Sequence, residues 1–240
     1  MARSAAPPKD DYDHLQASAV RATVVRLQHR IIARFPDRNL REVAGRLVNV
    51  VDQVAAGSEH ARRRITMARR LSRVGIAIAV LVTVATLYLA LRGAIDQRPS
   101  QSWEWVPLIE STISDLVYAG IAVFFLAAVP SRLERGATLA YLHRLRSLAH
   151  VIDMHQLTKD PDRIRSDFQR TDESIDLKMT KTELANYLDY CSEMLSLVAK
   201  TAALCAEDTT DSVVLDTVST IEQLTTGMSR KIWQKISLLQ

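Results

Sequence analysis

Apolar residues in this chain form two kinds of pattern, continuous runs and helical stripes. One run covers residues 74–91, which carry no formal charge, and a second covers residues 108–129. A hydrocarbon layer about 30 Å thick needs about 20 residues of helix to cross it. Backbone amides cannot stay unpaired in lipid, so both runs are predicted to be helices. We therefore expect a membrane hairpin over residues 74–129. A buried core helix of a soluble protein is the alternative for the first run.

The rest of the chain shows the spacing of three and four residues that is typical of amphipathic helices. This spacing predicts four segments, of which the second continues into the first membrane run: residues 12–33, 38–91, 132–156 and 212–238. A fifth helix is expected after Thr180 and Glu183, which form a capping-box pattern. Its apolar seam and that of the last helix are expected to pair as an antiparallel hairpin.

Local signals predict where several of these helices begin and end. Asp37 is expected to cap the helix that starts at Arg38, and Pro130 is expected to end the second membrane helix. Asp160 and Pro161 are predicted to start a short helix, followed by loop.

No strand-like alternation is present, and Gly and Pro are scarce at 7 each. We predict an all-α integral membrane protein with a cytoplasmic helical bundle or coiled-coil domain, and its spare apolar faces favour a homo-oligomer. Cys191 and Cys205 are expected to be core thiols. Four parts are expected: a disordered tail 1–11, N-terminal cytoplasmic helices 12–73, the hairpin 74–129, and a C-terminal cytoplasmic helical domain 130–240.

The basic residues predict the orientation of the hairpin. Arginines gather just before the first membrane run: Arg62, Arg63, Arg64, Arg69, Arg70 and Arg73. More arginines follow the second run, whereas the connecting loop has few. Because basic residues stay on the cytoplasmic side, both termini are expected to face the cytoplasm. Trp103 and Trp105 are expected near the outer headgroups.

Polar residues interrupt the beginning of the second membrane run. They are Glu110, Ser111, Ser114, Asp115 and Tyr118. A carboxylate in hydrocarbon costs about 2.5 kcal/mol or more, so Asp115 is expected to face water or a partner. If several subunits placed this strip around an axis, it would form a pore that attracts cations. The alternative is that Glu110 and Asp115 mark where the helix leaves the membrane.

The segment HVIDMHQLTKDPD, residues 150–162, is dense in functional side chains. Lys159, with Arg163 and Arg165, is a candidate for contacting the phosphate of a bound ligand at a helix start. A solvated connector is the alternative. The spacing of His150, Asp153 and His155 argues against a metal triad. No phosphate-binding loop, dinucleotide fingerprint or hydrolase motif is present, so we expect neither an enzyme nor a cofactor.

The hairpin, the helical domain that follows it, and the strings HVIDMHQLTKDPD and SRKIWQKI resemble two-helix membrane effectors of bacterial anti-phage defence, namely the SLATT-domain families and the effector of the Hailong system. This resemblance implies a bacterial inner-membrane protein whose cytoplasmic helices sense a nucleotide or oligonucleotide. A partner nucleotidyltransferase would make that ligand, and the spans would oligomerise and permeabilise the membrane.

The expected function is therefore an oligomeric pore or ion channel in the lipid bilayer, gated by its cytoplasmic helices. A membrane-anchored helical scaffold without transport activity is the alternative from a different class. A membrane enzyme that uses His150, Asp153 and His155 is a third and weaker alternative.

Overall fold

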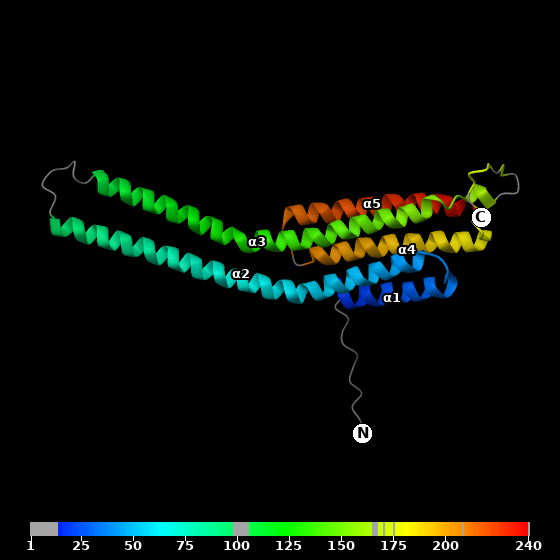
Figure 1. Ribbon diagram of the computed structural model, residues 1–240, viewed down its shortest axis with the longest axis horizontal. Coiled ribbons are helices and arrows are strands. Elements are labelled where there is room, and N and C mark those ends of the chain that lie inside the picture. Colours follow the sequence, from blue (N-terminus) through cyan, green and yellow to red (C-terminus); the bar gives the residue numbers. More distant parts are fainter. Residues whose placement is uncertain are drawn as a thin grey trace, which may run out of the picture. The chain divides into compact units, whose positions relative to one another are not determined.

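The computed structural model describes residues 14–97, 106–164, 168–169, 171–174, 176–207 and 209–239. Within these ranges the chain is all-helical, as the spacing of its apolar residues predicted. The elements in chain order are α1 (Ala17–Arg34), α2 (Leu40–Gln97), α3 (Val106–Leu157), the short 3-10 helix η2 (Pro161–Ile164), α4 (Lys181–Ala206) and α5 (Ser212–Ser237) (Figure 1). The predicted tail 1–11, Trp103, Trp105 and Arg165 lie outside the described residues.

The chain divides into two compact units. The bundle unit is made of residues 1–58 and 138–240, and the hairpin unit is residues 59–137. Helices α2 and α3 each run without a break from one unit into the other. The hairpin unit is therefore an insertion between two parts of the bundle unit.

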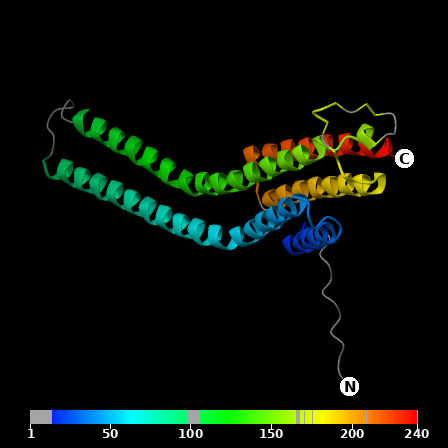
Figure 2. The same cartoon turned by 45° about the vertical axis from the view of Figure 1, so that its right-hand side comes forward.

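The bundle unit has one hydrophobic core to which all five α-helices contribute. The predicted stripe of α1 is buried at Val20, Val24, Leu27 and Ile31, and the predicted seam of α5 is buried from Val214 to Ile232. Helices α4 and α5 lie side by side, as expected, and α1 packs on α4 (Figures 1 and 2). Burying each such side chain contributes about 1.5–3 kcal/mol, so this core accounts for the stability of the unit.

Helix starts in the bundle unit follow the expected capping chemistry in two places. The Thr180 hydroxyl accepts from the amide of Glu183, and the Glu183 carboxylate accepts from the amide of Thr180, which completes the predicted capping box of α4. The Thr180 amide and the Thr180 hydroxyl both donate to the Glu183 carboxylate, and these two bonds lower the pKa of Glu183. The Asp211 carboxylate accepts from the amides of Val213 and Val214 at the start of α5. Such caps typically contribute about 1 kcal/mol each.

The hairpin unit has the opposite distribution of polar and apolar groups. Large apolar side chains such as Leu81, Val117 and Phe124 are more than half exposed. Among the described side chains of residues 66–137, the two buried ones are Ser72 and Pro130. A surface of this kind is unfavourable in water, because exposed apolar area costs about 25 cal/mol per Å². The helices over Thr66–Gly93 and from Ile109 onward are long and apolar enough to cross a membrane.

The prediction that Pro130 ends the second membrane helix is wrong. Pro130 lies inside α3, which continues to Leu157. Proline has no amide hydrogen and therefore leaves the carbonyl four residues earlier, that of Leu126, without its helical donor. The Ser72 hydroxyl of α2 donates to that carbonyl. The helix can continue because a side chain of the neighbouring helix replaces the missing backbone donor.

The contact around Ser72 extends along the facing surfaces of the two helices. A Cβ atom added at Gly75 would lie 3.2 Å from Leu126 Cδ1, so the absence of a side chain lets the helices approach closely. On the other side of Ser72, Arg69 Nη2 lies 3.3 Å from Glu134 Oε2. Arg69, Ser72 and Gly75 thus form one antiparallel contact strip with α3.

Two other predicted boundaries are wrong by a few residues. Helix α2 begins at Leu40, not at Arg38, so Asp37 does not adjoin its first residue. Helix α1 begins at Ala17, five residues after the predicted start. The short helix after Asp160 is confirmed as η2, with the Asp162 amide donating to Asp160 Oδ1 at 3.2 Å.

The hydrogen bond from Ser72 predicts that the effects of substitutions at Ser72 and Pro130 on stability are coupled. Ser72→Ala should destabilise the hairpin by about 0.6–1.7 kcal/mol, the range measured for hydrogen bonds between membrane helices. In a Pro130→Ala background the same change should cost less, because the substituted residue supplies its own backbone amide to the Leu126 carbonyl. A double-mutant cycle of thermal unfolding in detergent measures the difference. Equal costs in the two backgrounds would show that the serine hydroxyl does not serve this carbonyl.

Candidate functional site

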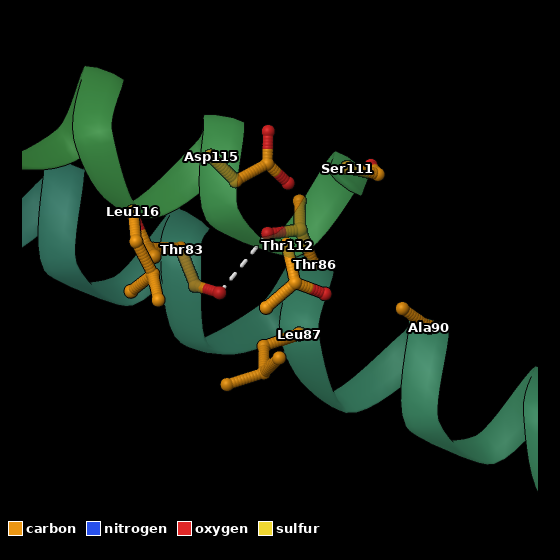
Figure 3. A pocket seen from close by; sticks show the side chains of 8 residues that line it. All are labelled: Thr83, Thr86, Leu87, Ala90, Ser111, Thr112, Asp115 and Leu116. Atoms are coloured by element: carbon orange, nitrogen blue, oxygen red, sulfur yellow. Dashed lines mark hydrogen bonds between the residues drawn. The ribbon is translucent and has the colours of Figure 1, made fainter. Parts of the chain in front are cut away.

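A pocket between the two helices of the hairpin unit is lined by polar side chains from both helices. The pocket has a volume of about 250 Å³, and its lining comes from both helices: Thr83, Thr86, Leu87, Ala90, Ser111, Thr112, Asp115 and Leu116. Figure 3 shows Asp115 on α3 across from Thr83 and Thr86 on α2. Ser111 and Asp115 are one helical turn apart, which places them on one face of α3.

The hydroxyls of Thr83 and Thr86 on α2 donate their protons within their own helix. Thr83 Oγ1 donates to the carbonyl of Ala79 at 2.9 Å, and Thr86 Oγ1 donates to the carbonyl of Thr83 at 3.0 Å. A hydroxyl has one proton and two lone pairs, so these two oxygens keep acceptor capacity. The pocket lining thus contains these two oxygens and the exposed carboxylate of Asp115, which are the ligand types that hard cations prefer.

The other residues of the predicted pore strip do not line this pocket. Glu110, Ser114 and Tyr118 are exposed on α3, and Tyr118 has 71% of its surface exposed. Sequence reasoning missed Thr112 as a lining residue. Its position three residues before Asp115 was the available signal, since residues at this spacing share a helix face.

The basic segment before the first span is described in part. Arg69 pairs with Glu134, and Arg70 and Arg73 are exposed. The side chains of Arg62, Arg63 and Arg64 lie outside the described residues. Exposed arginines next to an apolar helix are typical of contact with anionic lipid headgroups.

Lys159 lies half-buried at one end of the bundle unit. Its ammonium is 5.5 Å from the centre of the Tyr187 ring and 3.2 Å from the Thr158 hydroxyl. Burial lowers the pKa of Lys159, and the charges of Arg38 and Arg163 lower it further. Of the predicted phosphate contacts, the structure therefore brings Lys159 and Arg163 within electrostatic range of each other, while Arg165 lies outside the described residues.

The neighbouring C-terminal end of α3 is held by Lys235 of α5. Lys235 Nζ of α5 donates to the carbonyls of Gln156 at 3.0 Å and Lys159 at 3.4 Å. Cations near a helix C-terminus also interact favourably with its dipole. Burial lowers the pKa of Lys235. This lysine thus fixes the backbone from which Lys159 projects.

The remaining candidate residues lie on α3 and α4. His150 and His155 border an open groove with Met154, and burial lowers the pKa of His155. Asp153 instead accepts from Gln156 Nε2 at 2.6 Å. Among the described residues no group of His, Cys, Asp and Glu is arranged to hold a metal ion. The prediction that Cys191 is a core thiol is confirmed, since it is buried.

Comparison of the chain with protein-family models, curated proteins and solved structures gave no match.

The lowered pKa of Lys159 predicts a pH dependence of stability. Between the folded pKa and the ordinary value of 10.5, the unfolded chain binds more protons, so stability rises with pH in this window. Lys159→Met should raise the Tm at about pH 7. The stability of this variant should also increase less with pH across the window than that of the wild type. Thermal melts across the window measure both effects, with Lys200→Met on the exposed face of α4 as control. Parallel curves for wild type and Lys159→Met would contradict a destabilised ammonium at this position.

Proposed function

We propose that the chain is an oligomeric channel of the bacterial inner membrane, with both termini in the cytoplasm. The hairpin unit crosses the bilayer, and the bundle unit controls whether ions pass. This proposal accounts for two features of the hairpin unit. Lipid would cover the exposed leucines and valines, and the pocket would offer oxygen atoms to an ion.

The location of Asp115 in the pocket is the observation that carries this proposal. An ionised carboxylate among apolar helices costs about 2.5–3.5 kcal/mol at the bilayer centre, so it is retained where a function requires it. In this chain it faces hydroxyl-bearing side chains of the partner helix in the pocket rather than an arginine or lysine. We infer a cation pathway with Glu110 and Asp115 at its outer mouth, Ser111 one helical turn from Asp115, and Ser114 and Tyr118 along the pathway.

Control by the bundle unit is supported by the continuity of the chain. Helix α2 begins in the bundle unit and extends into the hairpin unit. Helix α3 begins in the hairpin unit and ends in the bundle unit. A ligand can shift such an equilibrium only through different affinities for the two states. We propose an anionic ligand, such as a nucleotide or oligonucleotide from a partner nucleotidyltransferase, with Lys159, Arg163 and Arg165 among its contacts.

The resemblance to two-helix effectors of anti-phage defence gives this proposal a biological setting. Opening of the channel would depolarise the inner membrane of an infected cell. The polar pocket and the continuous helices are compatible with that role. Both are features of the structure whether or not the chain acts in defence.

Replacing Asp115 tests the ion pathway. Asp115→Asn keeps the shape of the side chain and removes its charge, so it should lower cation selectivity of the protein in planar lipid bilayers. Glu110→Gln, whose side chain does not line the pocket, should change selectivity less. The reversal potential in a salt gradient measures this directly. An identical reversal potential for wild type and Asp115→Asn would remove Asp115 from the pathway.

A membrane-anchored scaffold is the second candidate, and exposed apolar side chains on α5 favour it. Val213, Leu215 and Trp233 on this helix are each more than two-fifths exposed. Exposed aromatic and aliphatic side chains of this kind are typical of surfaces that bind other proteins. In this account the hairpin only tethers the bundle.

Expression in cells separates the two functions. A channel released from control should collapse the membrane potential, which a potential-sensitive dye reports, and Asp115→Asn should change the extent of collapse. A scaffold should leave the potential unchanged at equal membrane abundance. A stable potential in cells that accumulate the wild-type protein would favour the scaffold.

A further inference from the structure

The pocket at Asp115 is built from a single chain. Its walls are α2 and α3, and the parts of both helices that form it belong to the hairpin unit, residues 59–137. Thr83 and Thr86 come from α2, and Ser111 and Asp115 come from α3 (Figure 3). The sequence suggested a ring of such groups around an axis shared by several subunits, whereas this pocket needs one subunit alone.

The hydroxyl oxygens of α2 can only accept hydrogen bonds. Thr83 Oγ1 and Thr86 Oγ1 each donate their one proton to a backbone carbonyl of α2. Each oxygen keeps lone pairs but has no further proton to donate. An anion needs donors, so these two groups do not suit one, whereas a cation is bound through lone pairs of this kind. The hydroxyls therefore favour positive charge, as Asp115 does.

The charge of the pocket is a single negative one. Asp115 is the one charged residue among the eight that line it, and it forms no ion pair with a described residue. One monovalent cation would neutralise this carboxylate. A divalent cation would leave a net positive charge among apolar helices, where uncompensated charge is costly. Divalent sites also gain affinity from the number of charged ligands, so one carboxylate favours a monovalent ion.

The size of the pocket indicates that a bound ion keeps part of its water. The volume is about 250 Å³, whereas one water molecule occupies about 30 Å³ in the liquid. Several waters can therefore remain around the ion, while Leu87, Ala90 and Leu116 complete the lining. Strong discrimination between Na⁺ and K⁺ requires protein oxygens to replace the hydration shell. Because the shell is partly kept here, the two ions should bind with similar affinity.

We propose that this pocket binds one partly hydrated monovalent metal cation, Na⁺ or K⁺, on the carboxylate of Asp115 and the hydroxyl oxygens of Thr83 and Thr86. The inference rests on the proposed function, in which the hairpin takes up cations, and it adds the class of ion and a site complete within one chain. Binding to the pocket is measured without ion flow. Absence of conductance in a protein that binds Na⁺ at Asp115 would therefore count against the channel alone.

Sodium NMR on the full chain in detergent tests the site, because exchange of Na⁺ with a protein-bound state broadens its line. The line should be broader with wild type than with Asp115→Asn. Glu134→Gln should match wild type, since it removes a carboxylate of the same helix that pairs with Arg69 and does not line the pocket. Potassium chloride should abolish the difference between wild type and Asp115→Asn at lower concentration than calcium chloride. N-methylglucamine chloride, the control for ionic strength, should leave it in place.

A second variant keeps the test valid if Asp115→Asn unfolds. Thr83→Val keeps the shape of the side chain and removes its oxygen, so it should weaken Na⁺ binding about two- to tenfold, the loss expected for one polar contact. Ser131→Ala is its control, because that hydroxyl also bonds within its own helix, to the carbonyl of Ala128, and does not line the pocket.

Three results would overturn the proposal. Equal line widths for wild type, Asp115→Asn and Thr83→Val would remove the ion from the pocket. Displacement of Na⁺ by calcium at lower concentration than by potassium would make the ligand a divalent ion. A broadening per chain that falls when the protein is diluted would place the site between chains.

Discussion

One hydrogen bond joins the two long helices at the point where α3 contains a proline. Pro130 removes the donor for the Leu126 carbonyl, and Ser72 of the other helix supplies a replacement. In water a solvent molecule could do this, but in hydrocarbon an unpaired carbonyl costs several kcal/mol. The bond therefore ties the pairing of α2 and α3 to the integrity of α3 itself, and Gly75 allows the close approach that it needs.

The two units distribute their apolar side chains in opposite ways. The bundle unit buries one apolar stripe of its helices in a common core. The hairpin unit exposes its apolar side chains and places a serine and a proline at the helix contact. Asp115 shares a pocket in the hairpin with hydroxyl-bearing side chains of both helices. A membrane location explains both distributions, and it gives Asp115 a reason to lie in a pocket rather than on the lipid-facing surface.

Periodicity predicted the helices of the bundle unit well, because each buries one stripe, as α1 and α5 do. It failed at Pro130, since the signal for a helix stop is local and the group that overrides it, Ser72, is more than fifty residues away along the chain. Asp115 was recognisable from its charge in an apolar run. That Thr83 and Thr86 line the same pocket as Asp115 depends on the rotation of one helix against the other, which sequence alone does not give.

The central claim is that the hairpin lies within the bilayer, and alkaline carbonate extraction of membranes from expressing cells tests it most directly. This treatment strips proteins that are bound only through charge or through other proteins. Because lipid-covered apolar helices are not released by it, the account predicts that the chain stays in the membrane pellet. Recovery of the chain in the supernatant as a folded, soluble protein would contradict the account.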